Sequence, residues 1–285
     1  MTGDLKSSVI DACLFTVLLA GFISIAGAAD NMLPDGERVT GTRQIKEAWL
    51  IQPTRRYRHG ILGDDIEAGG LSVILRNGSQ HQLLLDEGSV FEDRYPRLAD
   101  LDDDGEDEIY LVRSYLDRGA ALTVYEADGN GLRQGAETPA MGRPNRWLNP
   151  VGSADLDGDG EAEVALVTTP HIGGTLVVYR YMEGGVREKY RMNGFSNHAI
   201  GSREMRLSAI VDADGDGVTD LIVPSSDRTQ LRVLAIKGAS LKEIRRVRHQ
   251  TPISSAIDIL QPQTGGAPQL SYRLADGRRV LLDLR

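Results

Sequence analysis

The chain of 285 residues contains a single cysteine, Cys13, which excludes a disulfide scaffold, a thiolate metal site and CxxC redox chemistry. Aromatic residues make up only 5%, whereas there are 32 glycines. Many glycines with few aromatics favour a turn-rich, all-β chain over a helical one. Lys and Arg number 32 against 41 Asp and Glu, for a formal net charge of −9. This acidic balance argues against a nucleic-acid partner.

Recognisable catalytic motifs are also missing. The chain has no Gly-x-Ser-x-Gly elbow, no HExxH pair and no phosphate-binding glycine loop with Lys. The five histidines show no close ligand spacing, so we interpret each as a surface or loop residue: His59, His81, His171, His198 and His249. No enzyme is therefore predicted from motifs.

The N-terminus carries the one long apolar run. Ala12 to Ala29 is free of charged residues, and Ala26-Gly27-Ala28 provides small residues where a signal peptidase cleaves. We predict a signal peptide at residues 1–28 and a secreted or periplasmic mature protein without Cys13. The alternative is an uncleaved membrane anchor, because such a run is near the lower limit for spanning a bilayer.

Three acidic segments repeat without gaps. They read Asp-Leu-Asp-Asp-Asp-Gly-Glu-Asp-Glu at 100–108, Asp-Leu-Asp-Gly-Asp-Gly-Glu-Ala-Glu at 155–163 and Asp-Ala-Asp-Gly-Asp-Gly-Val-Thr-Asp at 212–220. Each is followed at once by a β-rich run such as Ile109–Val112, and further short strands and glycine turns separate the copies. A repeat of about 50 residues with four short strands is typical of a propeller blade.

Two degenerate copies flank the clear ones, near 63–70 and 258–266, and both have lost most of the carboxylates. The last copy ends two strands short, while Glu47–Ile51 and Arg58–Leu62 are two unassigned strands near the N-terminus. We predict that these strands complete one blade across the termini. The predicted fold is then one all-β domain over residues 29–285, a β-propeller of five blades of about 50 residues closed across the termini.

The acidic segments have the chemistry of a calcium loop. In D-x-D-x-D-G-x-x-[D/E], carboxylates at positions 1, 3, 5 and 9 converge because the glycine at position 6 permits a sharp turn. An EF-hand is excluded, since its bidentate Glu at position 12 is replaced by Leu111, Leu166 and Val223. The three segments hold 16 acidic residues and no Lys or Arg, which favours a bound cation.

On these motifs the chain resembles the FG-GAP or VCBS-type repeat, the blade unit of integrin-alpha-like propellers. The resemblance implies about three structural Ca²⁺ ions, one per loop. The implied ligands are Asp100, Asp102, Asp104, Glu108, Asp155, Asp157, Asp159, Glu163, Asp212, Asp214, Asp216 and Asp220. The chain departs from the family in lacking the Phe-Gly and Gly-Ala-Pro marks, in having Glu at position 9 of two loops, and in having Asp103 where glycine is usual.

The resemblance implies a binding or adhesion module with a protein or polysaccharide ligand, and we expect a monomer. Three basic segments, Arg55–His59, Arg245–His249 and Arg278–Arg279, are expected to converge if the termini share a blade, and the loop Arg143–Trp147 is a candidate contact. The alternative is a periplasmic lyase or hydrolase built on the propeller. A cleft with a perturbed carboxylate, Tyr or His outside the acidic loops would favour that enzyme. An uncleaved anchor would instead favour a membrane-attached part of an envelope assembly.

Overall fold

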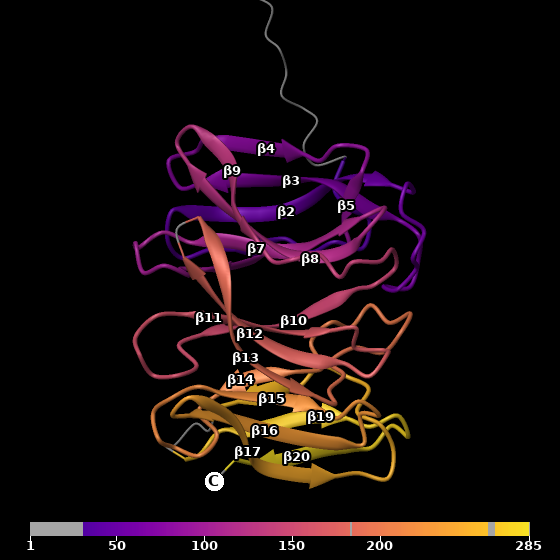
Figure 1. The fold of residues 1–285 in the computed structure, drawn as a ribbon, viewed down its shortest axis with the longest axis vertical. Helices are drawn as coiled ribbons and strands as arrows, with labels where there is room; N and C mark the ends of the chain where they lie inside the picture. The colour runs from indigo at the N-terminus through magenta and orange to yellow at the C-terminus, as the bar shows by residue number, and fades with distance from the viewer. Residues whose placement is uncertain (1–30, 183, 262–265, 285) are drawn as a thin grey trace, which may run out of the picture. The chain divides into compact units, whose positions relative to one another are not determined.

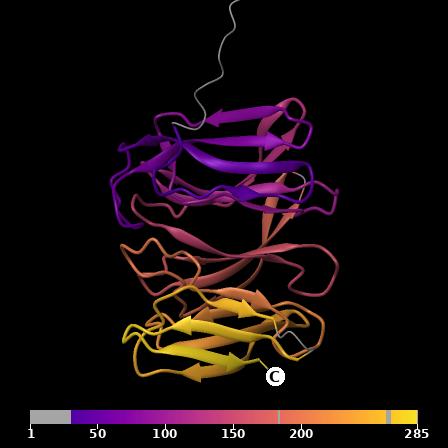
Figure 2. The same ribbon diagram turned by 180° about the vertical axis from the view of Figure 1, so that it is seen from behind.

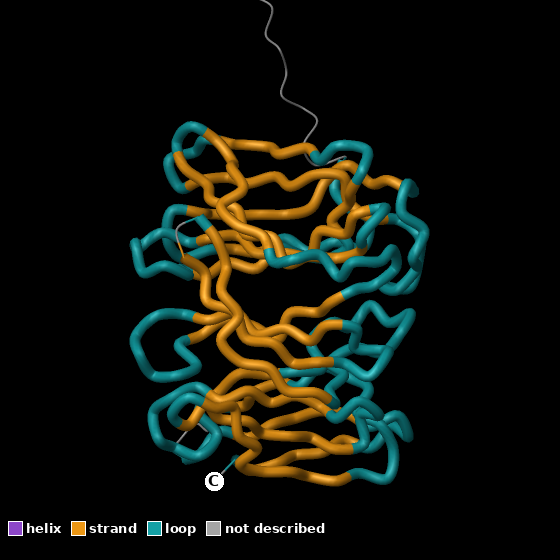
Figure 3. The backbone as a smooth tube through the Cα atoms, in the orientation of Figure 1, coloured by secondary structure: helices purple, strands orange, loops and turns teal. Residues whose placement is uncertain are grey.

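The computed structural model describes residues 31–182, 184–261 and 266–284. These residues form twenty β-strands and no helix (Figure 1). Figure 3 shows the same chain as strands and loops alone. The predicted all-β class is confirmed.

The first sheet combines two sequence repeats. Its nine strands are β1 (Val39–Thr40), β2 (Ile45–Thr54), β3 (Glu67–Leu75), β4 (Gln80–Leu84), β5 (Ser89–Phe91), β6 (Arg97–Ala99), β7 (Glu108–Tyr115), β8 (Gly119–Asp128) and β9 (Gly131–Glu137). The order is β1-β2-β3-β5-β7-β8-β9, while β4 pairs with β3 and β6 pairs with β7. β5 links the two repeats, because it pairs with both β3 and β7.

Three smaller antiparallel sheets follow in chain order. The second consists of β10 (Leu148–Ala154), β11 (Glu163–Thr168), β12 (Thr175–Met182) and β13 (Gly185–Asn193). The third consists of β14 (Ala209–Val211), β15 (Asp220–Pro224), β16 (Gln230–Lys237) and β17 (Ser240–Arg248). The fourth consists of β18 (Asp258–Leu260), β19 (Gln269–Arg273) and β20 (Arg279–Asp283).

The strands match the two kinds of hydrophobic pattern in the sequence. Central strands such as β7 and β15 are apolar runs buried on both faces, whereas the outer strand β17 alternates between exposed and covered residues. The 100–108, 155–163 and 212–220 loops join β6 to β7, β10 to β11 and β14 to β15. The degenerate copy at 63–70 leads into β3, and the one at 258–266 begins with β18, while its residues 262–265 lie outside the described residues. The sequence period therefore corresponds to a structural repeat.

Four apolar clusters hold successive repeats together. One cluster joins Leu71 of β3 to Leu111 of β7, and the next joins Val112 of β7 to Leu166 of β11. The remaining two lie between the second and third sheets and between the third and fourth. The sheets follow one another in this order in Figures 1 and 2. Burial of apolar side chains between adjacent repeats is therefore the main source of stability.

The predicted blade across the termini is not seen. Glu47–Ile51 lies within β2, which pairs with β1 and β3, so it belongs to the first sheet. Arg58–Leu62 is a turn and no strand, because Gly60 takes a left-handed φ of 64° there. Among the described strands, β20 pairs with β19 alone.

A loop, however, links the first repeat to the last. In the connection between β13 and β14, Arg203 pairs with Asp35 (3.1 Å) and Asp64 (2.7 Å) near the first sheet. Three residues later, the carbonyl of Arg206 accepts a hydrogen bond from the N–H of Ile257, just before β18. The two end repeats therefore share a connecting segment without sharing a strand pair.

The predicted signal peptide lies outside the described residues. Within the described part of the chain, no helix is long and apolar enough to cross a membrane.

Candidate functional sites: the acidic loops and a histidine pocket

The three acidic loops share one backbone conformation. Position 4 takes a left-handed φ in each, at 61° for Asp103, 77° for Gly158 and 83° for Gly215. Position 6 is also left-handed, at 90°, 93° and 89° for Gly105, Gly160 and Gly217. Two left-handed residues so close together turn the chain back on itself, and this brings the side chains of the loop to one point.

The same hydrogen bonds recur in the three loops. The position 9 carboxylate accepts the N–H of position 2, at 2.7 Å for Glu108, 3.0 Å for Glu163 and 2.9 Å for Asp220. The position 1 carboxylate accepts the N–H of the position 6 glycine at 3.1, 3.0 and 3.1 Å. These bonds fix two of the carboxylates before any ion binds.

Carboxylate oxygens converge in each loop. One oxygen from each of three residues lies within 4.8 Å of the others, in the groups Asp100–Asp102–Glu108, Asp155–Asp157–Asp159 and Asp212–Asp214–Asp220. Nine of the twelve residues named from the sequence are thus brought together. The other three, Asp104, Glu163 and Asp216, lie outside these groups.

The second loop already contains two cations. Arg180, whose side chain is 4% exposed, donates to Glu163 (2.8 Å) and Asp159 (2.9 Å) and pairs with Glu161. Lys189 pairs with Asp157 and donates to Glu163 (3.0 Å). Arg180 and the largely covered Lys189, 14% exposed, neutralise the carboxylates that a metal ion would need, so the second loop does not fit a further cation as it stands.

The strand register explains why, of the three loops, the second alone receives largely covered cationic side chains from the neighbouring strands. Arg180 stands directly opposite Glu163 on β12, and Lys189 occupies the bulge of β13. By the same register, the first repeat has Glu126 and Gly135 at these two places, and the third has Ala235 and Ile244. Neither of these pairs supplies a positive charge.

Among the described residues, the cations that reach the first and third loops are more exposed than those of the second. Arg43, at 41% exposure, pairs with Asp100 Oδ2, while the buried Asp100 Oδ1 has no hydrogen-bond partner in the described chain. Lys237, at 35% exposure, reaches Asp214 (3.2 Å) and Asp216. Side chains this exposed are free to move, so both loops fit a cation with oxygen ligands.

Burial and neighbouring charge raise the pKa of the carboxyl groups in these two loops. Burial, aided by Asp102 and Asp104, raises the pKa of Glu108 to about 7. Burial, aided by Asp214 and Asp216, raises the pKa of Asp220 to about 6. Without a cation, therefore, the first and third loops hold carboxylates that resist ionisation.

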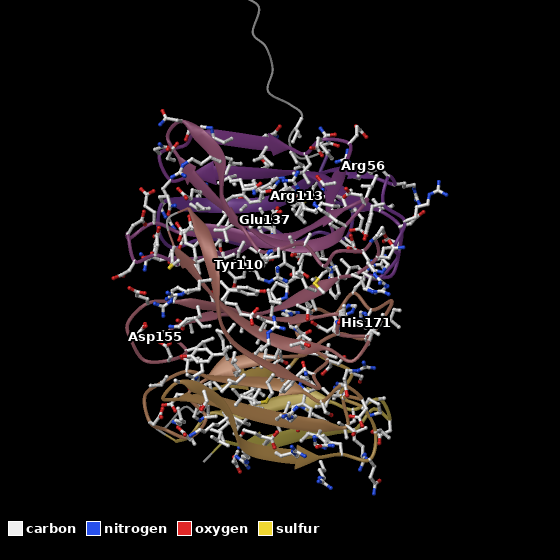
Figure 4. All side chains as sticks on the ribbon, viewed as in Figure 1. Arg56, Tyr110, Arg113, Glu137, Asp155 and His171 are labelled. Carbon is white, nitrogen blue, oxygen red and sulfur yellow. The ribbon has the colours of Figure 1, made fainter. Side chains whose placement is uncertain are left out.

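A pocket of about 290 Å³ lies at the other ends of the same strands. Figure 4 shows Asp155, in the second acidic loop before β11, and His171, just after β11, on opposite sides of the sheets. The pocket is lined by residues from four separate segments, among them His59, Arg146, Trp147, His171 and Ile200. It is thus assembled by the fold and not by a local motif.

A buried carboxylate supports one of these histidines. Glu92 is 0% exposed, and its Oε1 lies 2.6 Å from Nδ1 of His59. Its other oxygen accepts the hydroxyl of Ser114 (2.5 Å). Burial raises the pKa of Glu92, although the hydrogen bond from His59 opposes the rise. Because Nδ1 is engaged, Nε2 is the ring nitrogen of His59 that remains for a ligand.

Two further histidines form a chain behind the pocket. His198 Nε2 lies 2.9 Å from the carbonyl of Ser202, and its Nδ1 lies 2.9 Å from Nε2 of His171. A carbonyl only accepts, so neutral His198 carries its proton on Nε2 and accepts the proton of His171 Nε2. This leaves Nδ1 of His171 as an acceptor. Burial lowers the pKa of both rings to about 4, so both are neutral at pH 7.

Backbone strain also collects at the pocket. Asn145 and Thr169 both line it, and both take a left-handed φ, 56° and 44°. A β-branched residue such as Thr169 rarely adopts this conformation, and strain of this kind clusters at functional sites. The loop Arg143–Trp147, singled out in the sequence as a candidate contact, supplies three of the lining residues.

Sequence reasoning missed this constellation. His59, His171 and His198 do lie in loops, as interpreted from the sequence, but His198 is fully buried and hydrogen-bonded to His171, and His59 and His171 line one pocket. No spacing could have revealed this, since the three residues come from different connections. The expected convergence of basic segments is also only partial. Arg245 donates to the carbonyl of Asp283 (2.6 Å) beside the C-terminal strand, whereas Arg55–His59 follows β2 at the other end of the series (Figure 1).

The repeats have a counterpart among known families. Residues 100–166 match the FG-GAP-like repeat. The matched span runs from the first acidic loop through the second and into β11. The resemblance inferred from the loops is therefore confirmed over this span.

The fold of the chain also has a solved relative. It is similar to the crystal structure of an exotype rhamnogalacturonan lyase, YesX, with a TM-score of 0.50 and 14% sequence identity. The similarity covers 89% of this chain and 59% of the lyase, so the chain spans about 59% of the lyase length. At this identity the likeness concerns the fold alone, which is all-β and of propeller type. No curated protein matches the sequence.

Proposed function

We propose that the protein is an exported FG-GAP-type β-propeller that acts as a binding module and uses Ca²⁺ as a structural ion. The five successive repeats are the blades. The ring closes through the connection between β13 and β14, whose Arg203 and Arg206 contact segments beside the first and last sheets. The ligand is a protein or a carbohydrate outside the cell.

The observation that carries the calcium proposal is the convergence of three carboxylate oxygens within 4.8 Å in equivalent loops. Hard carboxylate oxygens suit Ca²⁺, which accepts six to eight ligands, better than Mg²⁺, which requires a strict octahedron. We assign Ca²⁺ to the loops at 100–108 and 212–220. Asp100, Asp102 and Glu108 would hold one ion, and Asp212, Asp214 and Asp220 the other.

The bound ion would supply positive charge at the point where the loop carboxylates meet. The protein side chains do the rest: the position 9 carboxylate ties each loop to its own backbone, and the glycine turns aim the remaining carboxylates inward. Removal of the ion is expected to destabilise the fold by mass action, by about 2.7 kcal/mol per site at a hundredfold excess of Ca²⁺ over Kd.

Thermal unfolding after chelation, followed by titration with Ca²⁺ or Mg²⁺, tests the proposal. Three matched variants at position 3, Asp102→Asn, Asp157→Asn and Asp214→Asn, separate the loops. We expect Ca²⁺ to raise the unfolding midpoint selectively, and the rise to shrink in the first and third variants but not in Asp157→Asn. Absence of a Ca²⁺-dependent rise in the unaltered protein would overturn the proposal.

An enzyme of the lyase or hydrolase class is the second candidate, and one observation favours it. The pair of His59 and buried Glu92 opens into a pocket outside the acidic loops. A histidine held by a carboxylate is a common general base. Incubation with acidic and neutral polysaccharides, with product release followed by reducing ends and ultraviolet absorbance, tests this candidate. Activity lost in His59→Gln would support it.

A further inference from the structure

The histidine pocket takes no part in the calcium sites, since it lies at the opposite ends of the strands (Figure 4). Its volume of about 290 Å³ is at the lower end of the range for small-molecule sites. A single ring with its substituents has a suitable size.

The charge around the pocket favours an anion. No carboxylate side chain lines it, and Arg146 does. Within the described chain, the guanidinium of Arg146 has no carboxylate in ion-pair distance, and its hydrogen bond is to the neighbouring carbonyl of Asn145 (3.3 Å). The nearest buried carboxylate, Glu92, is already engaged by His59 and Ser114. A guanidinium without a partner binds a ligand carboxylate in bidentate fashion.

The rest of the lining suits a ring that carries hydroxyl groups. Trp147 and His171 stack with an interplanar angle of 3°, and Ile61 and Ile200 add apolar surface. Nε2 of His59 and Nδ1 of His171 are the ring nitrogens left by the hydrogen bonds described above. Nδ1 of the neutral His171 accepts from a hydroxyl group, and Nε2 of His59 is placed to hydrogen-bond another, since a hydroxyl group both donates and accepts.

We infer that this pocket binds a hexuronate residue, as a free sugar acid or at the end of an acidic polysaccharide. Arg146 receives the carboxylate, the two histidines hydrogen-bond hydroxyl groups, and the apolar side chains cover a face of the ring. This inference rests on the binding function proposed above and names its ligand class.

Isothermal titration of the full, calcium-loaded protein with four probes tests the inference. Glucuronate and galacturonate carry both the carboxylate and the hydroxyl groups, glucose lacks the carboxylate, and benzoate lacks the hydroxyl groups. We expect a uronate to bind about tenfold or more tightly than glucose and benzoate, the usual effect of one charged hydrogen-bonding group. Equal binding of glucose, equal binding of benzoate, or no uronate binding would overturn it.

Two matched pairs of variants locate the site. Arg146→Gln should weaken uronate binding about tenfold, whereas Arg143→Gln, an exposed arginine of the same loop outside the pocket, should leave it unchanged. Ile200→Glu, at a rim residue that is 73% exposed, should repel the anion, whereas Leu281→Glu, 57% exposed on β20, should not. Equal losses of uronate affinity within either pair would indicate that the anion is attracted by the overall surface charge, and would contradict the assignment of the pocket.

The calcium-dependent rise in unfolding midpoint is measured on the same variants. It should stay unchanged in Arg146→Gln and Ile200→Glu, because neither residue lies near the acidic loops. Absence of uronate binding by the unaltered protein, with its calcium-dependent rise intact, refutes the pocket assignment alone. Absence of a calcium-dependent rise in the unfolding midpoint of the unaltered protein refutes the calcium proposal. The uronate titration then still decides whether the pocket assignment is correct.

Discussion

The two edges of the sheets are built in different ways. At one edge, three loops repeat a nine-residue motif, and each loop forms its own cluster of carboxylates. At the other edge, one pocket draws its lining residues from four connections, and among its ionisable side chains His59 is paired and His171 is neutral. Each cluster at the first edge is formed by residues close together in the sequence and recurs three times. The pocket at the second edge occurs once and is formed by residues distant in the sequence. The proposed structural ions therefore lie at one edge of the sheets, and the proposed ligand pocket lies at the other.

A second comparison lies within the acidic edge. The second loop carries its own counter-cations, Arg180 and Lys189, whereas the described cations that reach the first and third are more exposed. A buried side chain and a bound ion can serve the same purpose, which is to offset the repulsion between carboxylates. Loops with the same motif therefore need not all bind metal.

Giving the second loop the neighbouring residues of the third loop is expected to cause the largest change in the free energy of unfolding. The double variant Arg180→Ala, Lys189→Ile places the residues of the third repeat at the two cation positions. In chelator it should lower the free energy of unfolding by about 3 kcal/mol or more, because it leaves buried carboxylates unpaired. Added Ca²⁺ should restore part of this loss. Urea denaturation with and without Ca²⁺ measures both changes.

The control is Arg191→Ala on β13. Arg191 pairs with Glu188 but is 62% exposed, so its loss should change stability by less than about 1 kcal/mol. A double variant that is as stable in chelator as this control would show that the second loop does not depend on its cations.

The two edges should respond to acid in opposite directions. His171 and His198 have pKa values lowered from 6.5 to about 4, so the unfolded chain binds more protons, and stability is lost as pH falls from about 6.5 towards 4. In chelator, Asp220 has its pKa raised to about 6. Its ionisation therefore destabilises the fold, and stability is regained as pH falls through that value.

Denaturation in chelator at pH 7.5 and 5 checks both signs. Relative to the unaltered protein, His171→Gln should lose less stability on acidification. Asp220→Asn should be the more stable protein at pH 7.5, with a smaller advantage at pH 5. If Asp220→Asn were less stable at pH 7.5 in chelator, the account of the empty third loop would be wrong.

Relief of backbone strain in the first loop should cause the smallest change in the free energy of unfolding. Asp103 occupies a left-handed position, φ 61°, that glycine fills in the other two loops. Asp103→Gly should stabilise the protein by about 0.5–1 kcal/mol, and it also removes a negative charge. Asp103→Asn removes the charge and keeps a side chain that tolerates this φ. Chemical denaturation of both variants separates charge from backbone. A destabilised Asp103→Gly would contradict the strain argument.

The sequence predicted the features that depend on local spacing. The sharp turn at the position 6 glycine and the convergence of residues such as Asp212 and Asp214 follow from a motif of nine consecutive residues. The all-β class follows from the apolar runs after each motif, such as Ile109–Val112. Interactions within one loop or one hairpin can be predicted because their geometry is nearly independent of the rest of the chain.

Features that depend on pairing between distant segments escaped prediction. Arg180 neutralises the second loop from 17 residues beyond Glu163, and only the strand register shows that it faces the loop. The contact between His59 and Glu92 spans 33 residues, and it requires the turn that replaces the expected strand at Arg58–Leu62. Register and turn geometry decide such contacts, and the apolar pattern of one segment does not determine them.

Calcium stoichiometry tests the central claim most directly. Isothermal titration of chelated protein with Ca²⁺ should give two ions per chain, and three for the double variant Arg180→Ala, Lys189→Ile. Asp102→Asn and Asp214→Asn should each remove one ion. A stoichiometry of zero would contradict calcium binding by the loops. A stoichiometry of three in the unaltered protein would contradict the claim that Arg180 and Lys189 take the place of an ion in the second loop.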